Sequence, residues 1–197
     1  MTARDKLVQY LNEAHALEAA LVQTLVAHIA VTPEGPYRDL LERHLGETRN
    51  HTVRLEKRLG DLGAGRSPLA VGLGVLETVV GQAVAIGKAP IDLLRGTGGE
   101  EKLLKNAKDE CASEALEIAT YDAIEALAAS LRDEETASLA RAHRDEEEAM
   151  LRDLRALIPA LTEGVLAEEV LGVPVYDAGS TGAADAVKDA AQRVTSP

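Results

Sequence analysis

The stretch HLGETRNHTVRLEKRL, residues 44–59, combines the apolar spacing of an amphipathic helix with ionisable residues on the apolar line. Its last two leucines lie four residues apart, and His44, Glu47 and His51 extend their line toward the start of the stretch. Burying ionisable side chains is very unfavourable unless they are paired or coordinated. The stretch therefore predicts a helix inside a helical bundle, with a polar layer that needs a partner.

Helical spacing continues through most of the chain, and signals for β-strands are nearly missing. At the start, Thr2 and Asp5 match a capping pair, and Asp133 matches the N-cap of a later helix. Pro159 is expected to kink or end that later helix near Ile158, followed by a short helix up to Val170. The expected long helices span residues 4–31, 37–62, 100–131 and a segment that begins after Asp133.

The connections predict how these helices are arranged. A short break between the first and second helices makes them antiparallel neighbours. The insertion of about residues 64–99 is long enough for a crossover that places the second and third helices side by side in parallel, and it should contain extra short helices. Residues 1–172 are thus expected to form an all-α, antiparallel four-helix bundle, and residues 173–197 a flexible or loosely docked tail.

The composition favours an acidic protein with a single core. Of 197 residues, 46% are hydrophobic, and the formal net charge is −12. Without a basic stripe, and with four Tyr but no Phe or Trp, the chain is not expected to bind nucleic acid. The start MTARDKLVQY has no apolar signal core and Cys111 is the only cysteine, so we expect a cytoplasmic protein.

An apolar stretch within the insertion, residues 69–94, is the main candidate for a membrane contact. Glu77, Lys88 and Asp92 interrupt it, whereas a spanning helix needs about 20 residues with few or no charges. Binding to a membrane surface is therefore the less favoured interpretation. We expect this stretch to pack on the bundle and to contribute to a homodimer contact.

Each of the four apolar lines is polar at its centre. The polar residues are Glu18 on the first helix, His44, Glu47 and His51 on the second, Glu110, Glu114 and Glu117 on the third, and His143 and Glu147 on the fourth. Glu18, Glu114 and Glu147 fall about 14 residues after their helix starts, or roughly 20 Å along the axis, and Glu47 falls about 10 residues after its start. Four carboxylates are therefore expected to meet near the middle of the bundle, without a nearby Lys or Arg to balance them.

A pair of divalent cations would balance this charge. Oxygen-rich ligation with one or two imidazoles suits iron or manganese better than zinc. Known bundles with such sites take one Glu from each of two helices and a Glu-x-x-His pair from each of the others. The ligands expected around two ions per chain, with iron favoured and manganese as the alternative, are Glu18, Glu47, His51, Glu114, Glu117, His143 and Glu147.

Four further ionisable residues lie near these lines but are expected outside the ligand set. His15 and His44 are interpreted as residues that flank or support the ligands, and Glu110 as a cap of the polar layer or a solvent-facing residue. His28 stands near the end of the first helix, where the helix dipole favours a cation.

Four motifs together resemble one known family. They are NEAHALEAAL (residues 12–21), HLGETRNHTVRLEKRL (44–59), ASEALEIATYDAIEALA (112–128) and RDEEEAML (144–151). This pattern is similar to the YciE/YciF stress-protein branch of the ferritin-like superfamily. The resemblance implies a ferritin-like dimeric bundle linked to stress responses, with a di-iron site at Glu18, Glu47, Glu114, Glu117 and Glu147. One turn after Glu147, where such proteins often carry an acidic residue, this chain has Leu151.

Two functions from different classes follow. In the first, two carboxylate-bridged irons would react with oxygen or peroxide, which makes the chain a di-iron oxidoreductase of the ferroxidase or peroxidase-like kind. Glu47 and Glu147 are the expected bridges, and His51 is the expected imidazole ligand of one iron. In the second, a metal-free helical interaction protein assembles through the apolar insertion. The metal content of the purified protein separates these two functions.

Overall fold

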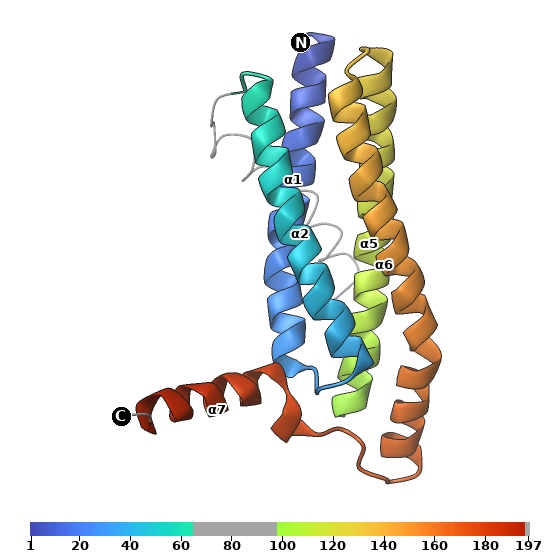
Figure 1. Ribbon diagram of the computed structural model, residues 1–197. Helices are drawn as coiled ribbons and strands as arrows, with labels where there is room; N and C mark the ends of the chain where they lie inside the picture. The colour runs from blue at the N-terminus through green and yellow to red at the C-terminus, as the bar shows by residue number, and fades with distance from the viewer. Residues whose placement is uncertain (65–97, 196–197) are drawn as a thin grey trace.

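Four long helices lie side by side in the computed structural model, which describes residues 1–64 and 98–195 (Figure 1). Within those ranges the chain forms no β-strand, and the only bridge between extended residues joins Pro33 to Thr181. The all-α prediction is therefore confirmed. The helices of the bundle are α1 (Ala3–Val31), α2 (Pro36–Asp61), α5 (Gly99–Ser130) and α6 (Glu134–Val165).

The bundle is built from two antiparallel helix pairs, α1 with α2 and α5 with α6. The pairs face each other so that α1 packs against α5 and α2 packs against α6. Helices α2 and α5 run in the same direction, as predicted, but across the diagonal of the bundle (Figure 1). The prediction that they lie side by side is wrong, because α1 and α6 occupy the positions between them.

Local capping chemistry sets the helix starts. At α1 the backbone N–H of Asp5 donates to Oγ1 of Thr2 at 3.1 Å, and the Asp5 carboxylate accepts from the Thr2 N–H at 2.7 Å. At α6 the Asp133 carboxylate accepts from the backbone N–H of Thr136 at 3.1 Å. Both predicted caps are confirmed, and each satisfies backbone donors that the first helical turn leaves free.

Pro159 was predicted to kink or end helix α6 near Ile158, and α6 does not end there but continues to Val165. A proline inside a helix removes one backbone hydrogen bond and crowds the preceding turn. Leu157, Ile158 and Leu161 pack against the apolar core on both sides of this proline. Their packing holds the helix together across the defect, and residues Leu166–Val170 extend it as a π-helical turn.

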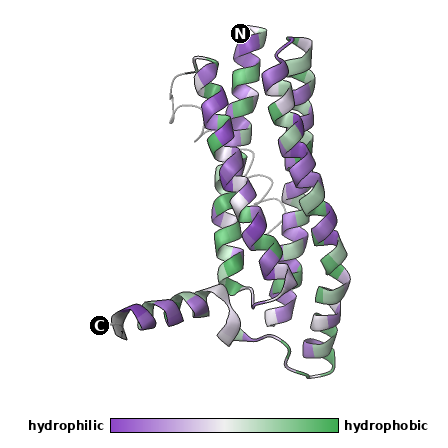
Figure 2. Ribbon diagram, in the orientation of Figure 1, coloured by the Kyte–Doolittle hydropathy of each residue, from purple (hydrophilic) through white to green (hydrophobic). Residues whose placement is uncertain are grey.

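Two apolar clusters fill the interior, one toward each end of the bundle. Hydrophilic and hydrophobic residues are interspersed along each of the four helices, as Figure 2 shows. The first cluster contains Leu7, Leu11, Ala14, Leu55, Leu59, Tyr121, Ile124, Ala128, Ala137 and Ala140. The second contains Leu21, Leu25, Tyr37, Leu40, Leu41, Leu103, Ala107, Met150 and Leu154.

The C-terminal segment leaves the end of α6 and returns to the turn between α1 and α2. The guanidinium of Arg38 donates to the Ser180 carbonyl at 3.0 Å and to Asp185 at 2.6 Å. At Gly182 an added Cβ would lie 2.7 Å from the carbonyl oxygen of Ile29, so glycine permits this close approach. Helix α7 (Gly182–Thr195) then points away from the bundle (Figure 1).

Helix α1 is, within residues 1–64 and 98–195, the one helix long and apolar enough to cross a membrane by length and composition. Core helices of bundles pass the same test, and the apolar line of α1 packs inside this bundle with Glu18 in its middle. The match is therefore weak support for a membrane span. The apolar stretch of residues 69–94, with its predicted short helices and homodimer contact, lies outside the described residues.

Candidate metal centre

A layer of buried ionisable side chains separates the two apolar clusters. Every side chain in this layer is at most 3% exposed, and none of them is a Lys or Arg. Among the described residues the buried arginine is Arg58, which instead binds Asp133 near the far end of α2. The members of the layer are Glu18, His44, His51, Glu110, Glu114, Glu117, His143 and Glu147.

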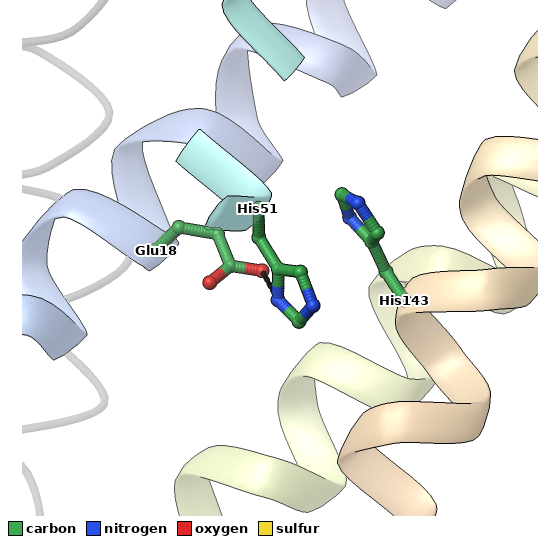
Figure 3. Close-up of side chains that lie close together, drawn as sticks. All are labelled: Glu18, His51 and His143. Atoms are coloured by element: carbon green, nitrogen blue, oxygen red, sulfur yellow. Dashed lines mark hydrogen bonds and ion pairs between the residues drawn. The ribbon is translucent and has the colours of Figure 1, made fainter. Parts of the chain in front are cut away.

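The first group of donors in this layer comes from α1, α2 and α6. Glu18, His51 and His143 each offer one donor atom, and these atoms lie within 4.8 Å of one another (Figure 3). Nδ1 of His51 is 3.2 Å from Oε1 of Glu18. The His51 and His143 rings stack with centroids 4.0 Å apart. Two imidazoles and a carboxylate therefore converge where these three helices meet.

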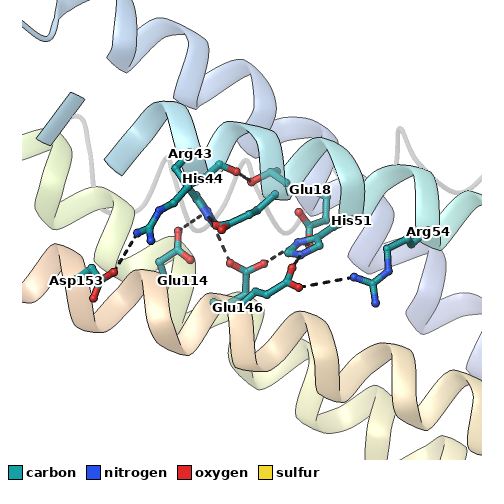
Figure 4. Close-up of polar contacts among 11 residues, drawn as sticks. Glu18, Arg43, His44, His51, Arg54, Glu114, Glu146 and Asp153 are labelled. Carbon is teal, nitrogen blue, oxygen red and sulfur yellow. Dashed lines mark hydrogen bonds and ion pairs between the residues drawn. The ribbon is translucent and has the colours of Figure 1, made fainter. Parts of the chain in front are cut away.

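The second group comes from α2, α5 and α6 and consists of His44, Glu114 and Glu147. Nε2 of His44 lies 3.1 Å from Oε1 of Glu114 (Figure 4) and 3.7 Å from Oε2 of Glu147. Neither contact has the geometry of a hydrogen bond. Nε2 of His44, both carboxylate oxygens of Glu114 and both of Glu147 are buried without a hydrogen-bond partner. The three side chains thus point at a common space without satisfying one another.

Glu147 connects the groups, and the buried Glu117 lies near them. Oε1 of Glu147 is 2.9 Å from Nδ1 of His51, so this carboxylate contacts the first group as well as the second. Both carboxylate oxygens of Glu117 are buried without a hydrogen-bond partner. Burial raises the pKa of Glu117 well above its ordinary value, and the nearby charges of Glu18, Glu147 and Glu114 raise it further. The two groups therefore form one continuous site.

Carboxylates outside the layer orient two of the imidazoles. Nε2 of His51 lies 2.5 Å from Oε2 of Glu146 (Figure 4). Nδ1 of His44 lies 3.4 Å from Oε2 of Glu47. A carboxylate that accepts the N–H of one ring nitrogen leaves the other nitrogen free to bind a metal ion. In both residues the other ring nitrogen faces the site: Nε2 of His44 is without a hydrogen-bond partner there, and Nδ1 of His51 contacts Glu18 and Glu147.

Tyr121 supports the first group from the side of the apolar cluster. Its hydroxyl donates a hydrogen bond to Oε1 of Glu18. Its ring meets the His143 ring edge-on, with the centroids 5.0 Å apart. The tyrosine therefore positions the Glu18 carboxylate and covers one side of His143.

The pKa values of the layer are shifted because several carboxyl groups and imidazoles lie close together away from water. Burial raises the pKa of Glu114 to about 8 and also raises that of Glu18. For His44 and His51, burial lowers the pKa, but the neighbouring carboxylates outweigh it and raise the values to about 10 and about 11. Burial, together with the charge of His51, lowers the pKa of His143 to about 2. Without a metal ion, the site therefore retains protons on its carboxylates.

Unsatisfied donors are concentrated in this site. Among the described residues, 12 buried side-chain N or O atoms lack a hydrogen-bond partner, and ten of these belong to Glu18, His44, Glu114, Glu117, His143 and Glu147. Leaving a buried polar atom unpaired costs about 1–3 kcal/mol. The donor atoms of each group lie within 4.8 Å of one another, and most of them are among these unpaired atoms. The donor set therefore fits metal ions.

The structure brings together six of the seven side chains predicted as ligands, with Glu47 as the exception. Glu47 is 34% exposed at the edge of the layer, and His44 stands in the site instead. The reason is the register of α2, whose buried line runs through Leu41, His44, Thr48 and His51. Carboxylates thus reach the centre from three helices and not from four.

The remaining ionisable residues lie farther from the ligand groups. His15 pairs with Glu56 near the surface. Leu151, which stands where proteins of the family that the sequence resembles often carry an acidic residue, is half-buried and belongs to neither group. Glu110 is buried and contacts His28, so it does not face solvent. Glu146 was not predicted to contribute, although its position next to Glu147 places it within reach of the ring of His51.

Comparison with known proteins gives a family match and several similar folds. A family model described as "Domain of unknown function (DUF892)" matches residues 2–167, which contain both donor groups. A protein of Xanthomonas campestris (XCC3681) is 22% identical with a TM-score of 0.67, and the match covers 85% of this chain and 99% of that chain.

Two further solved structures share this fold. The E. coli stress protein YciF is 20% identical with a TM-score of 0.61, over 83% of this chain and 98% of that chain. YcfI of Rhodopseudomonas palustris is 21% identical with a TM-score of 0.63, over 79% of this chain and 94% of that chain. At these identities the similarity establishes the fold, and the function has to be argued from the site.

Proposed function

The chain belongs to the DUF892 family, and from this membership and the buried donor site we propose that it is a ferritin-like protein that holds two iron ions in its bundle. The ten unpaired donor atoms in one dry layer carry this proposal. Ionised carboxylates buried without Lys or Arg are very unfavourable, so this layer either keeps protons on its carboxylates or binds cations.

The geometry suggests which residues would hold each ion. Glu18, His51 and His143 would hold one, and His44 with Glu114 would hold the other. Glu147 touches both groups, and Glu117 places two free oxygens beside them, so these two glutamates are suited to bridge the pair. The number of donors exceeds what one ion needs, which favours a binuclear centre.

The types of donor favour iron. Four carboxylates and three imidazoles suit iron or manganese, whereas structural zinc sites prefer tetrahedral sets rich in Cys and His. Bound iron would supply electrons to oxygen or peroxide. The chain would remove Fe(II), the oxidant or both under stress, and the name of the similar E. coli stress protein supports that setting.

The protein's own side chains would prepare this chemistry. Glu146 contacts His51 and Glu47 contacts His44, and each contact turns the other ring nitrogen of the histidine toward the site. The Tyr121 hydroxyl holds Glu18 in place. The apolar clusters on both sides exclude bulk water, which strengthens electrostatic interactions inside the layer. We further propose that the protein acts in the cytoplasm and as a homodimer.

Anaerobic titration with Fe(II), followed by elemental analysis of the desalted protein, tests the proposal. We expect about two irons per chain, and ferric absorption that grows when oxygen or peroxide is added. Glu114→Gln should lower the iron content, while the exposed control Glu148→Gln should not. An iron-free wild-type protein after anaerobic loading would contradict the proposal and favour a metal-free helical interaction protein.

A further inference from the structure

A buried polar branch extends from the candidate metal centre and belongs to neither donor group. Glu110 on α5 is fully buried at its side chain, and its Oε1 lies 2.5 Å from Nδ1 of His28 on α1. Its second oxygen, Oε2, is buried and has no hydrogen-bond partner. The hydroxyl of Tyr37, at the start of α2, is also buried without a partner. Burial raises the pKa of this hydroxyl, and the nearby charge of Glu110 raises it further. The branch therefore contains two oxygen atoms that could accept a ligand.

The branch lies one helical turn from the second donor group along α5. Glu110, Glu114 and Glu117 follow one another at intervals of four and three residues, so they share one face of α5. At 1.5 Å per residue, Glu110 is about 6 Å along the helix axis from Glu114. The charge of Glu110 also contributes to the raised pKa of Glu117. These three carboxylates form a ladder that leads into the centre.

His28 joins this ladder to solvent. Its side chain is 13% exposed, whereas the side chain of its partner Glu110 is fully buried. His28 lies in the last turn of α1, away from the middle of the bundle where Glu18 stands. An imidazole at this place can meet a cation in solvent and remain in contact with the buried carboxylate.

A purely structural His–Glu pair would not need this arrangement. The pair of His15 and Glu56 has its atoms 3.2 Å apart and both side chains open to solvent, so neither partner is desolvated. Glu110, in contrast, bears the cost of burial and still has one oxygen unpaired. A role of the His28 and Glu110 pair beyond stabilising the fold would explain why a carboxylate is buried here despite this cost in free energy.

We infer, on the basis of the proposed metal function, that His28 and Glu110 form an entry point through which divalent cations pass from solvent to the group of His44, Glu114 and Glu147. The free Oε2 of Glu110 and the Tyr37 hydroxyl supply oxygen ligands on the way, and Glu114 takes the ion one turn farther along α5. This step moves the ion without any reaction with dioxygen and without electron transfer.

Stopped-flow loading of the metal-free protein with Co(II) under anaerobic conditions tests the entry point, with cobalt absorption as the readout. Glu110→Gln keeps the size of the side chain and removes its charge, and His28→Phe keeps a ring that cannot bind metal. We expect both variants to load at least tenfold more slowly than wild type and to reach the same final stoichiometry. The matched control Glu56→Gln, in the surface pair with His15, should load at the wild-type rate.

The outcomes separate this inference from the proposed function. Slow loading with an unchanged endpoint supports an entry point, and circular dichroism of each variant verifies that the helices are retained. Wild-type loading rates in both variants would overturn the inference while leaving the metal centre in place. Loss of an ion at equilibrium in Glu110→Gln would also overturn it, because Glu110 would then be a resident ligand. A wild-type protein that binds no Co(II) and no Fe(II) would contradict both proposals.

Discussion

Oε1 of Glu147 lies 2.9 Å from Nδ1 of His51, while Oε2 of the same carboxylate turns toward Nε2 of His44 at 3.7 Å. One side chain on α6 therefore contacts both α2 imidazoles that face the site. This contact turns two groups of three donors into one connected centre. This contact supports the prediction that Glu147 bridges two ions.

Replacement of Glu147 should affect both ions. Glu147→Gln keeps the volume of the side chain but removes the anionic charge and one of the two oxygens. We expect the iron content to fall from about two per chain to one or fewer, with unchanged helical content. The neighbouring exposed residue provides the control, since Glu148→Gln should retain both ions. Two tightly bound ions in the Glu147 variant would remove its role as a bridge.

Glu146 and Glu47, which contact the imidazoles of His51 and His44, should affect the affinity for metal more than the number of ions bound. Glu146→Gln and Glu47→Gln each weaken the orientation of one imidazole, and changes of this kind typically reduce metal affinity about 10–100-fold. Competition with a chelator of known affinity measures the effect. We expect two ions per chain at saturating metal in both variants.

Glu47 allows a sharper comparison, because the sequence predicted it as a ligand and the structure places it behind His44. Under the structural assignment, Glu47→Ala retains both ions at saturating metal, and Glu114→Ala loses one. If Glu47→Ala instead loses an ion and Glu114→Ala retains both, Glu47 is a ligand as the sequence predicted. Elemental analysis of the two variants after identical loading decides between the assignments.

The metal-free protein should become less stable as the pH rises above neutrality. Burial raises the pKa of Glu114 from 4.5 to about 8, and neighbouring carboxylates overcome burial to raise the pKa of His44 from 6.5 to about 10. Between pH 6.5 and 8 the folded chain therefore keeps protons that the unfolded chain has released. Stability falls with pH wherever the folded state binds more protons, by on the order of 1 kcal/mol per pH unit for each extra proton.

Chemical denaturation in the presence of a chelator, at pH 6.5 and at pH 9, measures this loss. His143 acts in the opposite direction only below pH 6.5, because its folded pKa is lowered to about 2 by burial and the charge of His51. Bound metal replaces the protons on the ligands, so the loaded protein should lose much less stability over the same range. A metal-free protein that is equally stable at both pH values would contradict the pKa shifts.

The fold was largely predictable because its signals are local. The capping pair at Thr2 and the N-cap at Asp133 fix helix starts through contacts within one turn, and helical periodicity needs only the neighbouring residues. The diagonal placement of α2 and α5 and the tolerance of Pro159 depend on packing between distant parts of the chain. Neither of these could be obtained from local patterns.

The site was predictable to the extent that the register of each helix was known. Steps of three and four from Leu41 lead to His44, Thr48 and His51, and this register excludes Glu47 from the buried line. The positions of His44 and Glu47 relative to the core could therefore have been found by following that register. The contact between His51 and Glu146 could not, because it depends on how α2 and α6 pack together.

Anomalous scattering at the iron edge, from crystals grown after anaerobic Fe(II) loading, tests the binuclear centre most directly. We predict two peaks about 3.5–4 Å apart, one bounded by Glu18, His51 and His143 and the other by His44 and Glu114, with Glu147 in contact with both. The absence of iron from this layer, with the same donors still unpaired, would contradict the account.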